Sequence, residues 1–513
     1  MKILINNIKM PLGHNIDDVF AAARNIVRSG FVSAQNFSIY KQSLDARRKN
    51  NIHYVYSVVA DADKLPDVKD VTALCEDSRL CVLKISLPSR PVVVGMGPCG
   101  LFAAYILALS GNPPLIIERG EDVDARSESV RKFWETGVLN PNSNVQFGEG
   151  GAGTFSDGKL TTRISDRRQR FVLETFVKFG APADILYKAK PHIGTDLLRE
   201  VIKNMRNELI RLGAEVKFRS CVTDFKIKNG ALCAIEINNN EFIECKGAIL
   251  AIGHSSRDTY SALDFCGIEL EPKAFAIGAR IEHSQKFIDR LQYGAITGLP
   301  PADYRVAYNG KDRSCYSFCM CPGGTVVNAS SEEGHLAVNG MSYHKRDGEN
   351  ANSALVVTVT PADFPHSRLG GIEFQRKYEK LAFELGGGKA PVQAVSDFMK
   401  NTPSVQVGNV SPSVKGGYVL SSLDRCLPSY VTQTLREGLV DFERKLPGFA
   451  SGGAVLTGIE TRTSAPVRIL RDSNLQSTSA KGLFPSGEGA GFAGGIVSAA
   501  VDGIRSALAM IEE

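Results

Sequence analysis

The chain has 513 residues, of which 43% are hydrophobic, and this is enough to bury more than one core, so we expect two or three domains. A formal net charge of +5 is too small for this length to indicate a nucleic-acid or membrane partner by itself. Eleven cysteines, an odd number without paired spacing, indicate reduced thiols and exclude a disulfide framework.

The first residues and the apolar runs predict a cytoplasmic protein without a membrane span. Residues 1–7 lack the charged region, the long apolar stretch and the cleavage site of a signal peptide. The most apolar run, residues 101–109, is about half the roughly 20 residues that a membrane helix needs. The C-terminal apolar segment is interrupted by Asp502 and Arg505.

Residues 1–88 predict a small N-terminal α+β domain, which the prolines at 88 and 91 separate from the rest. The basic run 47–49 between two of its strands is typical of a solvated hairpin tip. The expected elements are a helix at 17–27 that ends at Gly30, and strands at 3–8, 37–44, 52–59 and 80–86.

Residues 89–270 begin with a nucleotide-binding motif and predict the first part of a Rossmann-like domain. A buried strand at 92–94 is followed by G-x-G-x-x-G, an apolar helix and a second strand at 115–117. Gly95 allows the tight turn, Gly97 lacks the Cβ that would collide with a pyrophosphate, and Gly100 lets helix and strand pack closely. Glu118 is placed to accept hydrogen bonds from a ribose diol, which favours FAD or NAD over NADP.

The last segment, residues 461–513, predicts a second strand, glycine turn and helix that complete the same domain. The strand is expected at 483–487 and the helix at 496–511, and a similar strand signal occurs at 247–253. Residues 271–460 have long alternating stretches and many Gly, Pro and Ser residues. The predicted fold class is therefore α/β, with a Rossmann-like domain, an inserted sheet-rich α+β substrate domain and the small N-terminal domain.

These glycine segments resemble the glutathione-reductase-like FAD family, the two-dinucleotide-binding-domain flavoproteins. In that family the terminal loop carries an acid, usually Asp, near the ribityl-pyrophosphate region, and this chain has Glu488 there. The resemblance implies non-covalent FAD. The cofactor-binding residues that the motifs and the resemblance imply are Gly95, Gly97, Pro98, Cys99, Gly100, Glu118, Arg119, Gly151, Gly253, Gly487, Glu488, Gly494, Gly495 and Ile496.

Three further runs, at 148–160, 319–324 and 487–491, are more specifically similar to the bacterial group described as FAD-dependent or NAD(FAD)-utilizing dehydrogenases. This resemblance spans nearly the whole chain, the N-terminal domain included. It implies a cofactor but no particular substrate or reaction.

Lys159 is one candidate for a catalytic residue. The run 153–159 satisfies G-x-x-x-x-G-K, but Leu160 replaces the Ser or Thr that binds magnesium and no buried strand precedes it, so we reject an ATPase. Beside a flavin, Lys159 could steady a reduced, anionic ring or a substrate carbonyl. The alternative is a surface lysine on an ordered loop.

Other candidates are Cys319, Cys321 and Arg462. Cys315, Cys319 and Cys321 do not have an iron–sulfur spacing, and they are either structural thiols or, as the resemblance implies, part of a turn near the flavin. Arg462 could meet an anionic substrate or be a solvated loop arginine. The sequence contains no H-E-x-x-H, and we predict no metal site.

The predicted function is an FAD-dependent oxidoreductase, a dehydrogenase or a double-bond reductase, acting on a small molecule. Only one dinucleotide fingerprint is present, so NAD(P)H is a possible electron donor that the sequence does not plainly encode. The alternatives are an FAD-dependent RNA-modifying enzyme, which the modest charge disfavours, and a non-catalytic FAD-binding sensor. The sequence does not specify the substrate, the oligomeric state or the role of residues 1–88.

Overall fold

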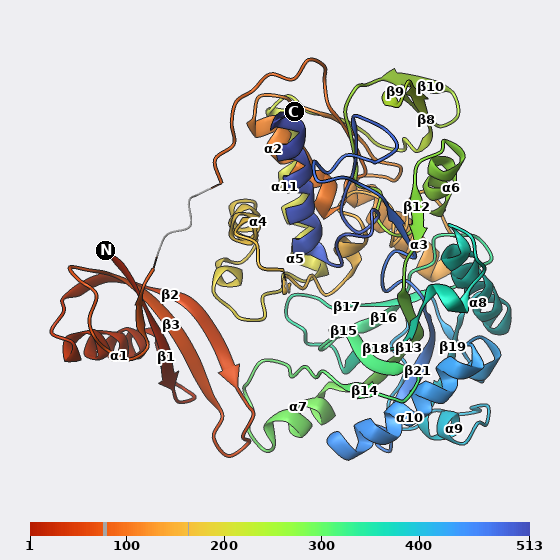
Figure 1. Ribbon diagram of the computed structural model, residues 1–513. Helices are drawn as coiled ribbons and strands as arrows, with labels where there is room; N and C mark the ends of the chain where they lie inside the picture. Colours follow the sequence, from red (N-terminus) through yellow and green to blue (C-terminus); the bar gives the residue numbers. More distant parts are fainter. Residues whose placement is uncertain (75–79, 163, 513) are drawn as a thin grey trace.

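The computed structural model describes residues 1–74, 80–162 and 164–512 and has a mixed α/β fold (Figure 1). One sheet is parallel throughout, and several antiparallel sheets surround it. The parallel sheet lies in one unit, a seven-stranded sheet that is antiparallel except for one parallel pair lies in a second unit, and a small four-stranded sheet lies in an N-terminal unit at the left of the view.

The N-terminal unit is a four-stranded antiparallel sheet in the order β2-β3-β1-β4 with one helix. Its helix α1 begins at a capping box of Asn15 and Asp18 and buries Val19, Ala23 and Val27, which lie four residues apart on one face. The elements are β1 (Lys2–Met10), α1 (Ile16–Ser29), β2 (Ala34–Asp45), β3 (His53–Ala62) and β4 (Val71–Ala73).

The strand predicted at residues 80–86 does not form, and β4 takes the fourth place in this sheet. Leu80, Val82 and Leu87 instead pack against the core of the parallel-sheet unit. The side chain of Asn112 accepts from the Leu87 amide at 2.8 Å and donates to the Ile85 carbonyl at 2.6 Å. The apolar run is therefore an extended connection bound by a side chain, and alternation alone could not distinguish it from a strand.

The parallel sheet has the order β23-β11-β5-β6-β7. Its central strands are buried along their whole length, as expected for a sheet covered on both faces. The strands are β5 (Val92–Val94), β6 (Leu115–Ile117), β7 (Glu215–Lys217), β11 (Ala248–Leu250) and β23 (Leu483–Pro485), and the helices are α2 (Pro98–Leu109), α3 (Val123–Thr136), α4 (Arg168–Lys178), α5 (Thr195–Arg211), α6 (Arg257–Phe265) and α11 (Ile496–Glu512).

Helix α2 is apolar on all sides because it lies between the sheet and α11 (Figure 1). The two helices pack so closely that a Cβ at Gly503 would lie 2.1 Å from the carbonyl oxygen of Cys99. A small antiparallel sheet is attached to this unit, and it consists of β8 (Val222–Lys228), β9 (Ala231–Ile237) and β10 (Glu241–Glu244).

The second unit is built on a seven-stranded sheet in the order β14-β15-β18-β13-β21-β19-β20. The chain enters and leaves this unit through the paired strands β12 (Leu270–Pro272) and β22 (Val467–Ile469). The other strands are β13 (Phe275–Ser284), β14 (Ala307–Asn309), β15 (Ser314–Cys321), β16 (Thr325–Asn328), β17 (Val338–Met341), β18 (Asn350–Val359), β19 (Ala390–Ala394), β20 (Tyr418–Leu420) and β21 (Val455–Glu460), and the helices are α7 (Gln285–Tyr293), α8 (Gly370–Gly386), α9 (Val395–Met399) and α10 (Ser429–Lys445).

The β2–β3 hairpin joins the N-terminal unit to the other two. The Gln42 amide donates to the Tyr187 carbonyl at 2.8 Å, and the Ala189 amide donates to the Gln42 carbonyl at 2.8 Å. Ile52, directly before β3, is buried in the core of the second unit with Tyr293 and Tyr304. No described helix combines the length and the hydrophobicity that a membrane crossing requires.

Candidate functional site

One cavity, of about 410 Å³, opens where the carboxyl ends of four neighbouring parallel strands meet the second unit. The loops that follow β5, β6, β11 and β23 all contribute to its wall, because parallel strands end at the same edge of the sheet. Two further walls come from the segment around the 3₁₀ turn Ala152–Phe155 and from strands β15, β17 and β21.

The first glycine motif has two glycines that the fold itself requires and one that it does not. A Cβ at Gly95 would lie 2.4 Å from the Ala251 carbonyl oxygen, and a Cβ at Gly100 would lie 1.9 Å from the Gly95 carbonyl oxygen. At Gly97 the nearest atom to such a Cβ, the Gly151 Cα, is 3.7 Å away. Gly494, on the opposite loop, has no atom within 4 Å. Both Gly97 and Gly494 line the cavity.

Glu118 directly follows β6 and holds the glycine loops together. Its carboxylate accepts hydrogen bonds from the amides of Met96 at 2.8 Å, Gly120 at 2.9 Å and Gly148 at 3.0 Å. The side chain is buried but lines the cavity wall. Arg119 beside it pairs with Asp258 and lies over the Phe147 ring, 4.2 Å from its centroid.

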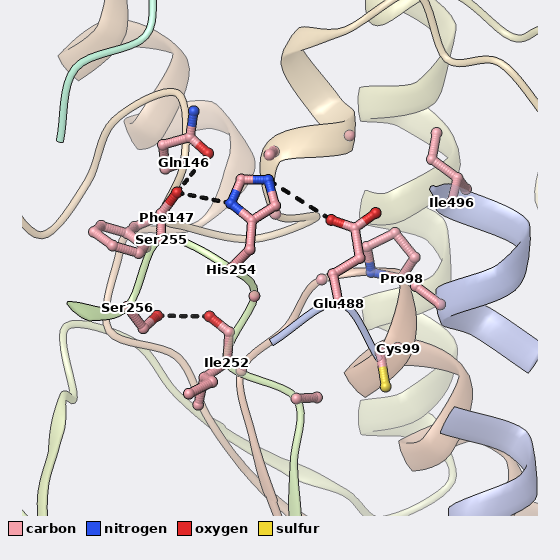
Figure 2. Close-up of a pocket in the computed structure, with 18 of the residues that line it drawn as sticks. Pro98, Cys99, Gln146, Phe147, Ile252, His254, Ser255, Ser256, Glu488 and Ile496 are labelled. Carbon is pink, nitrogen blue, oxygen red and sulfur yellow. Dashed lines mark hydrogen bonds and ion pairs between the residues drawn. The ribbon is translucent and has the colours of Figure 1, made fainter. Parts of the chain in front are cut away.

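Glu488 and His254 face each other across the cavity, with 3.9 Å between the Glu488 Oε2 and the His254 Nε2 (Figure 2). Burial raises the pKa of Glu488, and burial together with the nearby Arg462 lowers the pKa of His254 to about 4. His254 is therefore neutral at physiological pH, and its Nδ1 lies 3.0 Å from the Ser255 hydroxyl.

The second unit contributes Cys319 and Glu460 to the wall opposite these loops, and Lys159 approaches from the first unit. Lys159 Nζ donates to the carbonyl of Met320. Arg280, fully buried below the wall, donates to the Cys319 carbonyl at 2.7 Å and to Glu460 Oε2 at 3.1 Å. Cys319 is exposed to the cavity, but desolvation by the surrounding protein raises the pKa of its thiol to about 12.

Arg462 is a buried member of a charged cluster rather than a solvated loop arginine. Its guanidinium donates to both oxygens of Glu379, at 3.2 and 3.1 Å, and to the Ser331 hydroxyl at 2.5 Å. Glu379 also accepts from Arg257 at 2.7 and 2.9 Å. Arg462 still lines the cavity, but these hydrogen bonds hold its charge in place.

Most residues that the sequence singled out lie on this one cavity, although they come from segments up to several hundred positions apart. Those on the wall are Gly95, Gly97, Pro98, Cys99, Glu118, Arg119, Gly151, Lys159, Gly253, Cys319, Cys321, Arg462, Glu488, Gly494, Gly495 and Ile496.

Three residues are placed elsewhere. Gly100 and Gly487 do not line the cavity, because Gly100 is at the contact of α2 with Gly95 and a Cβ at Gly487 would lie 2.8 Å from the Cys99 Cβ. Cys315 packs in the second unit's core beside Gly438, so the three cysteines of C-x-x-x-C-x-C do not converge. The described cysteines are free thiols, and Cys75 is outside the described residues.

Several residues of the cavity wall were not predicted, because they come from isolated positions in the sequence. Glu460 is the first residue of the polar segment in which only Arg462 was singled out. Ser220, Cys221 and Asn339 also line the cavity. None of them belongs to a local motif, so no spacing signal could have found them.

Comparison with known proteins places the chain among relatives. Residues 274–463 match a family described as FAD-dependent protein, C-terminal domain-like. An uncharacterised protein of Clostridium beijerinckii is 52% identical over 532 aligned positions, which cover 100% of this chain and 99% of the relative.

Solved structures are more distantly similar. A geranylgeranyl bacteriochlorophyll reductase-like protein of Thermoplasma acidophilum is 15% identical, with 82% of this chain and 77% of that chain covered and a TM-score of 0.35. The flavin-dependent brominase Bmp2 is 12% identical, with 82% and 78% covered and a TM-score of 0.37. Scores this low assign no function. The full-length identity shows that the chain belongs to the same family as the Clostridium beijerinckii protein, and its residues 274–463 match the family described as FAD-dependent protein, C-terminal domain-like.

Proposed function

We propose that the protein is an oxidoreductase that holds FAD non-covalently in the cavity and acts on a small molecule, as a dehydrogenase or a double-bond reductase. The observation that carries the proposal is the pair of glycines, Gly97 and Gly494, that line the cavity without any protein atom close enough to exclude a side chain. Gly95 and Gly100 are explained by packing, whereas Gly97 and Gly494 are explained by a ligand that needs the space.

The residues around the cavity fit a dinucleotide along its length. Glu118 Oε2 accepts only the Met96 amide among the described donors, so a ribose hydroxyl could add a second hydrogen bond. The N-terminus of α2 has Gly97 as its cap and no side-chain cap, which leaves its amides for a pyrophosphate. The cavity volume lies within the range of cofactor sites.

Bound FAD would supply hydride or electron transfer, and the protein residues would orient the reactants and handle protons. The Gly494–Gly495 loop precedes α11, whose N-terminus favours negative charge. The second unit covers this region and provides the wall on which a substrate would lie. NAD(P)H is a candidate electron donor. The single dinucleotide fingerprint is assigned to FAD, so NAD(P)H would have to bind without a fingerprint of its own.

The test is the absorption spectrum of the purified full-length protein, mass analysis of the compound released on denaturation, and anaerobic titration with NADH, NADPH and dithionite. We expect a flavin spectrum, release of FAD, and bleaching by a reductant followed by recovery with an electron acceptor. A flavin that dithionite alone reduces would favour the sensor, and salt-dependent tRNA binding would favour RNA modification. A protein that binds no flavin would contradict the proposal.

A further inference from the structure

The wall formed by β15, β21 and the Lys159 loop, which we call the acid–base wall, brings together Lys159, Cys319 and Glu460. Cys319 comes from the end of β15, Glu460 is the last residue of β21, and Lys159 pairs by backbone with His192. The three side chains are separated by as many as 301 positions in the sequence, and all three face the same cavity.

Cys319 is held in a conformation that exposes its side chain to the cavity. Its φ is +42°, in the left-handed region that residues other than glycine seldom adopt, and it lies at a register shift between β15 and β18. Arg280 holds the carbonyl of Cys319 and Lys159 holds the carbonyl of Met320. Met320 and Cys321, which follow it, are buried, so Cys319 is the exposed thiol of this segment although Cys321 also lines the cavity.

Glu460 is 3% exposed, and one of its two carboxylate oxygens accepts a hydrogen bond. Oε2 accepts from Arg280, while Oε1 has no hydrogen-bond donor among the described residues. Gly340 leaves room for the arginine, because a Cβ there would lie 2.3 Å from Arg280 Nη2. The Arg280–Glu460 pair is electrically neutral, and Lys159 forms no ion pair with a described carboxylate. The acid–base wall therefore carries one uncompensated positive charge.

We propose that the acid–base wall is the substrate end of the cavity, where Lys159 donates a hydrogen bond to a carbonyl or carboxylate oxygen of the substrate and the Cys319 thiol exchanges a proton with the adjacent carbon. Glu460 and Arg280 are positioning residues. This assignment rests on the proposed function, since proton exchange at that carbon accompanies hydride transfer at its neighbour.

In the direction of double-bond reduction, the substrate gains one hydride and one proton. In that direction bound, reduced FAD would supply a hydride to the carbon farther from the carbonyl, and Lys159 would stabilise the negative charge that develops on the carbonyl oxygen. The S–H bond of Cys319 then breaks and a C–H bond forms at the nearer carbon. The thiolate regains a proton from water, and the oxidation direction reverses each step.

The electrostatics of the acid–base wall suit a proton donor. Cys319 is exposed to the cavity, yet the protein around its thiol raises its pKa to about 12 by desolvation, and Cys321 and Glu460 act in the same direction. Lys159 and Arg280 lower the pKa and would stabilise the thiolate when it forms. The thiol therefore keeps its proton at neutral pH until a substrate takes it.

The first experiment measures iodoacetamide alkylation of Cys319 against pH in the full-length protein, resolved by peptide mass analysis with Cys233 as an internal reference. Glu460→Gln removes a negative charge, so we expect alkylation at pH 8.5 about tenfold faster than in the wild type. Lys159→Met should slow it, and Lys159→Arg should restore the wild-type rate. The matched control is Glu443→Gln, a half-buried carboxyl on α10 that accepts from the Gly448 and Ala450 amides away from the cavity and should change nothing.

The second experiment uses benzoate as a carboxylate probe. Benzoate should protect Cys319 from alkylation in the wild type and in Lys159→Arg, but several-fold less in Lys159→Met. Identical alkylation profiles in Glu460→Gln, Lys159→Met and the wild type would overturn the assignment, as would protection that does not depend on Lys159. Both readouts need no turnover and no flavin, so a failure of FAD binding would be seen separately in the absorption spectrum.

Discussion

At the scale of single residues, the glycine motif and Glu118 could be predicted because their partners lie nearby in the sequence or follow a fixed spacing. Gly95, Gly97 and Glu118 all lie on the cavity wall. Glu460 could not be predicted, because its partner Arg280 is 180 positions away and nothing local distinguishes it from a surface glutamate.

Glu149, a fully buried carboxyl beside the glycine loops, gives the residue-scale prediction. Burial raises its pKa to about 7 although the Val123 amide and Arg206 donate to it at 2.7 and 3.0 Å. The folded state therefore binds this proton more tightly than the unfolded state does, and the free energy of unfolding should fall by roughly 3 kcal/mol as the pH rises from about 4.5 to above 7.

Urea unfolding of the wild type and of Glu149→Gln at pH 5 and pH 8 measures this effect. The wild type should be more stable at pH 5 relative to Glu149→Gln than at pH 8, because the amide cannot ionise. An equal difference between the two proteins at both pH values would show that Glu149 does not titrate in this range.

At the scale of secondary structure, the structure confirms the βαβ unit and the terminal strand and helix. These elements could be predicted because burial, glycine turns and helix signals agree in each of them. The strand predicted at 80–86 was wrong because the partner of its backbone is the Asn112 side chain. Pairing of this kind depends on tertiary contacts and leaves no periodic signal.

Glu379 gives the prediction at this scale, because it joins the start of α6, helix α8 and the loop after β21. It is fully buried between Arg257 and Arg462, which hold its pKa well below its usual range. Glu379→Gln would leave two buried guanidinium groups without a full counter-charge, so we expect a loss of about 3–5 kcal/mol in the free energy of unfolding. Glu384→Gln, on the exposed face of the same helix, should change it by less than about 0.5 kcal/mol. Similar losses in urea unfolding of both variants would contradict this role.

At the scale of the whole molecule, the sequence indicated a mixed α/β protein with glycine loops that meet, and the parallel sheet explains why they meet. What it could not indicate is which wall of the cavity the second unit would supply, because that depends on packing between distant segments. The N-terminal unit is attached through Gln42 and Ile52, and neither residue belongs to a pattern that predicts such a contact.

The measurement that tests the central claim most directly is FAD binding, followed by titration of flavin fluorescence, in the wild type, Gly97→Ala and Gly386→Ala. Neither alanine meets a protein atom closer than 3.6 Å, so both variants should fold and melt as the wild type does. If the space at Gly97 belongs to FAD, Gly97→Ala should bind it at least tenfold more weakly while Gly386→Ala, on α8, binds it normally. Equal FAD affinity in all three proteins, or no binding by the wild type, would contradict the account.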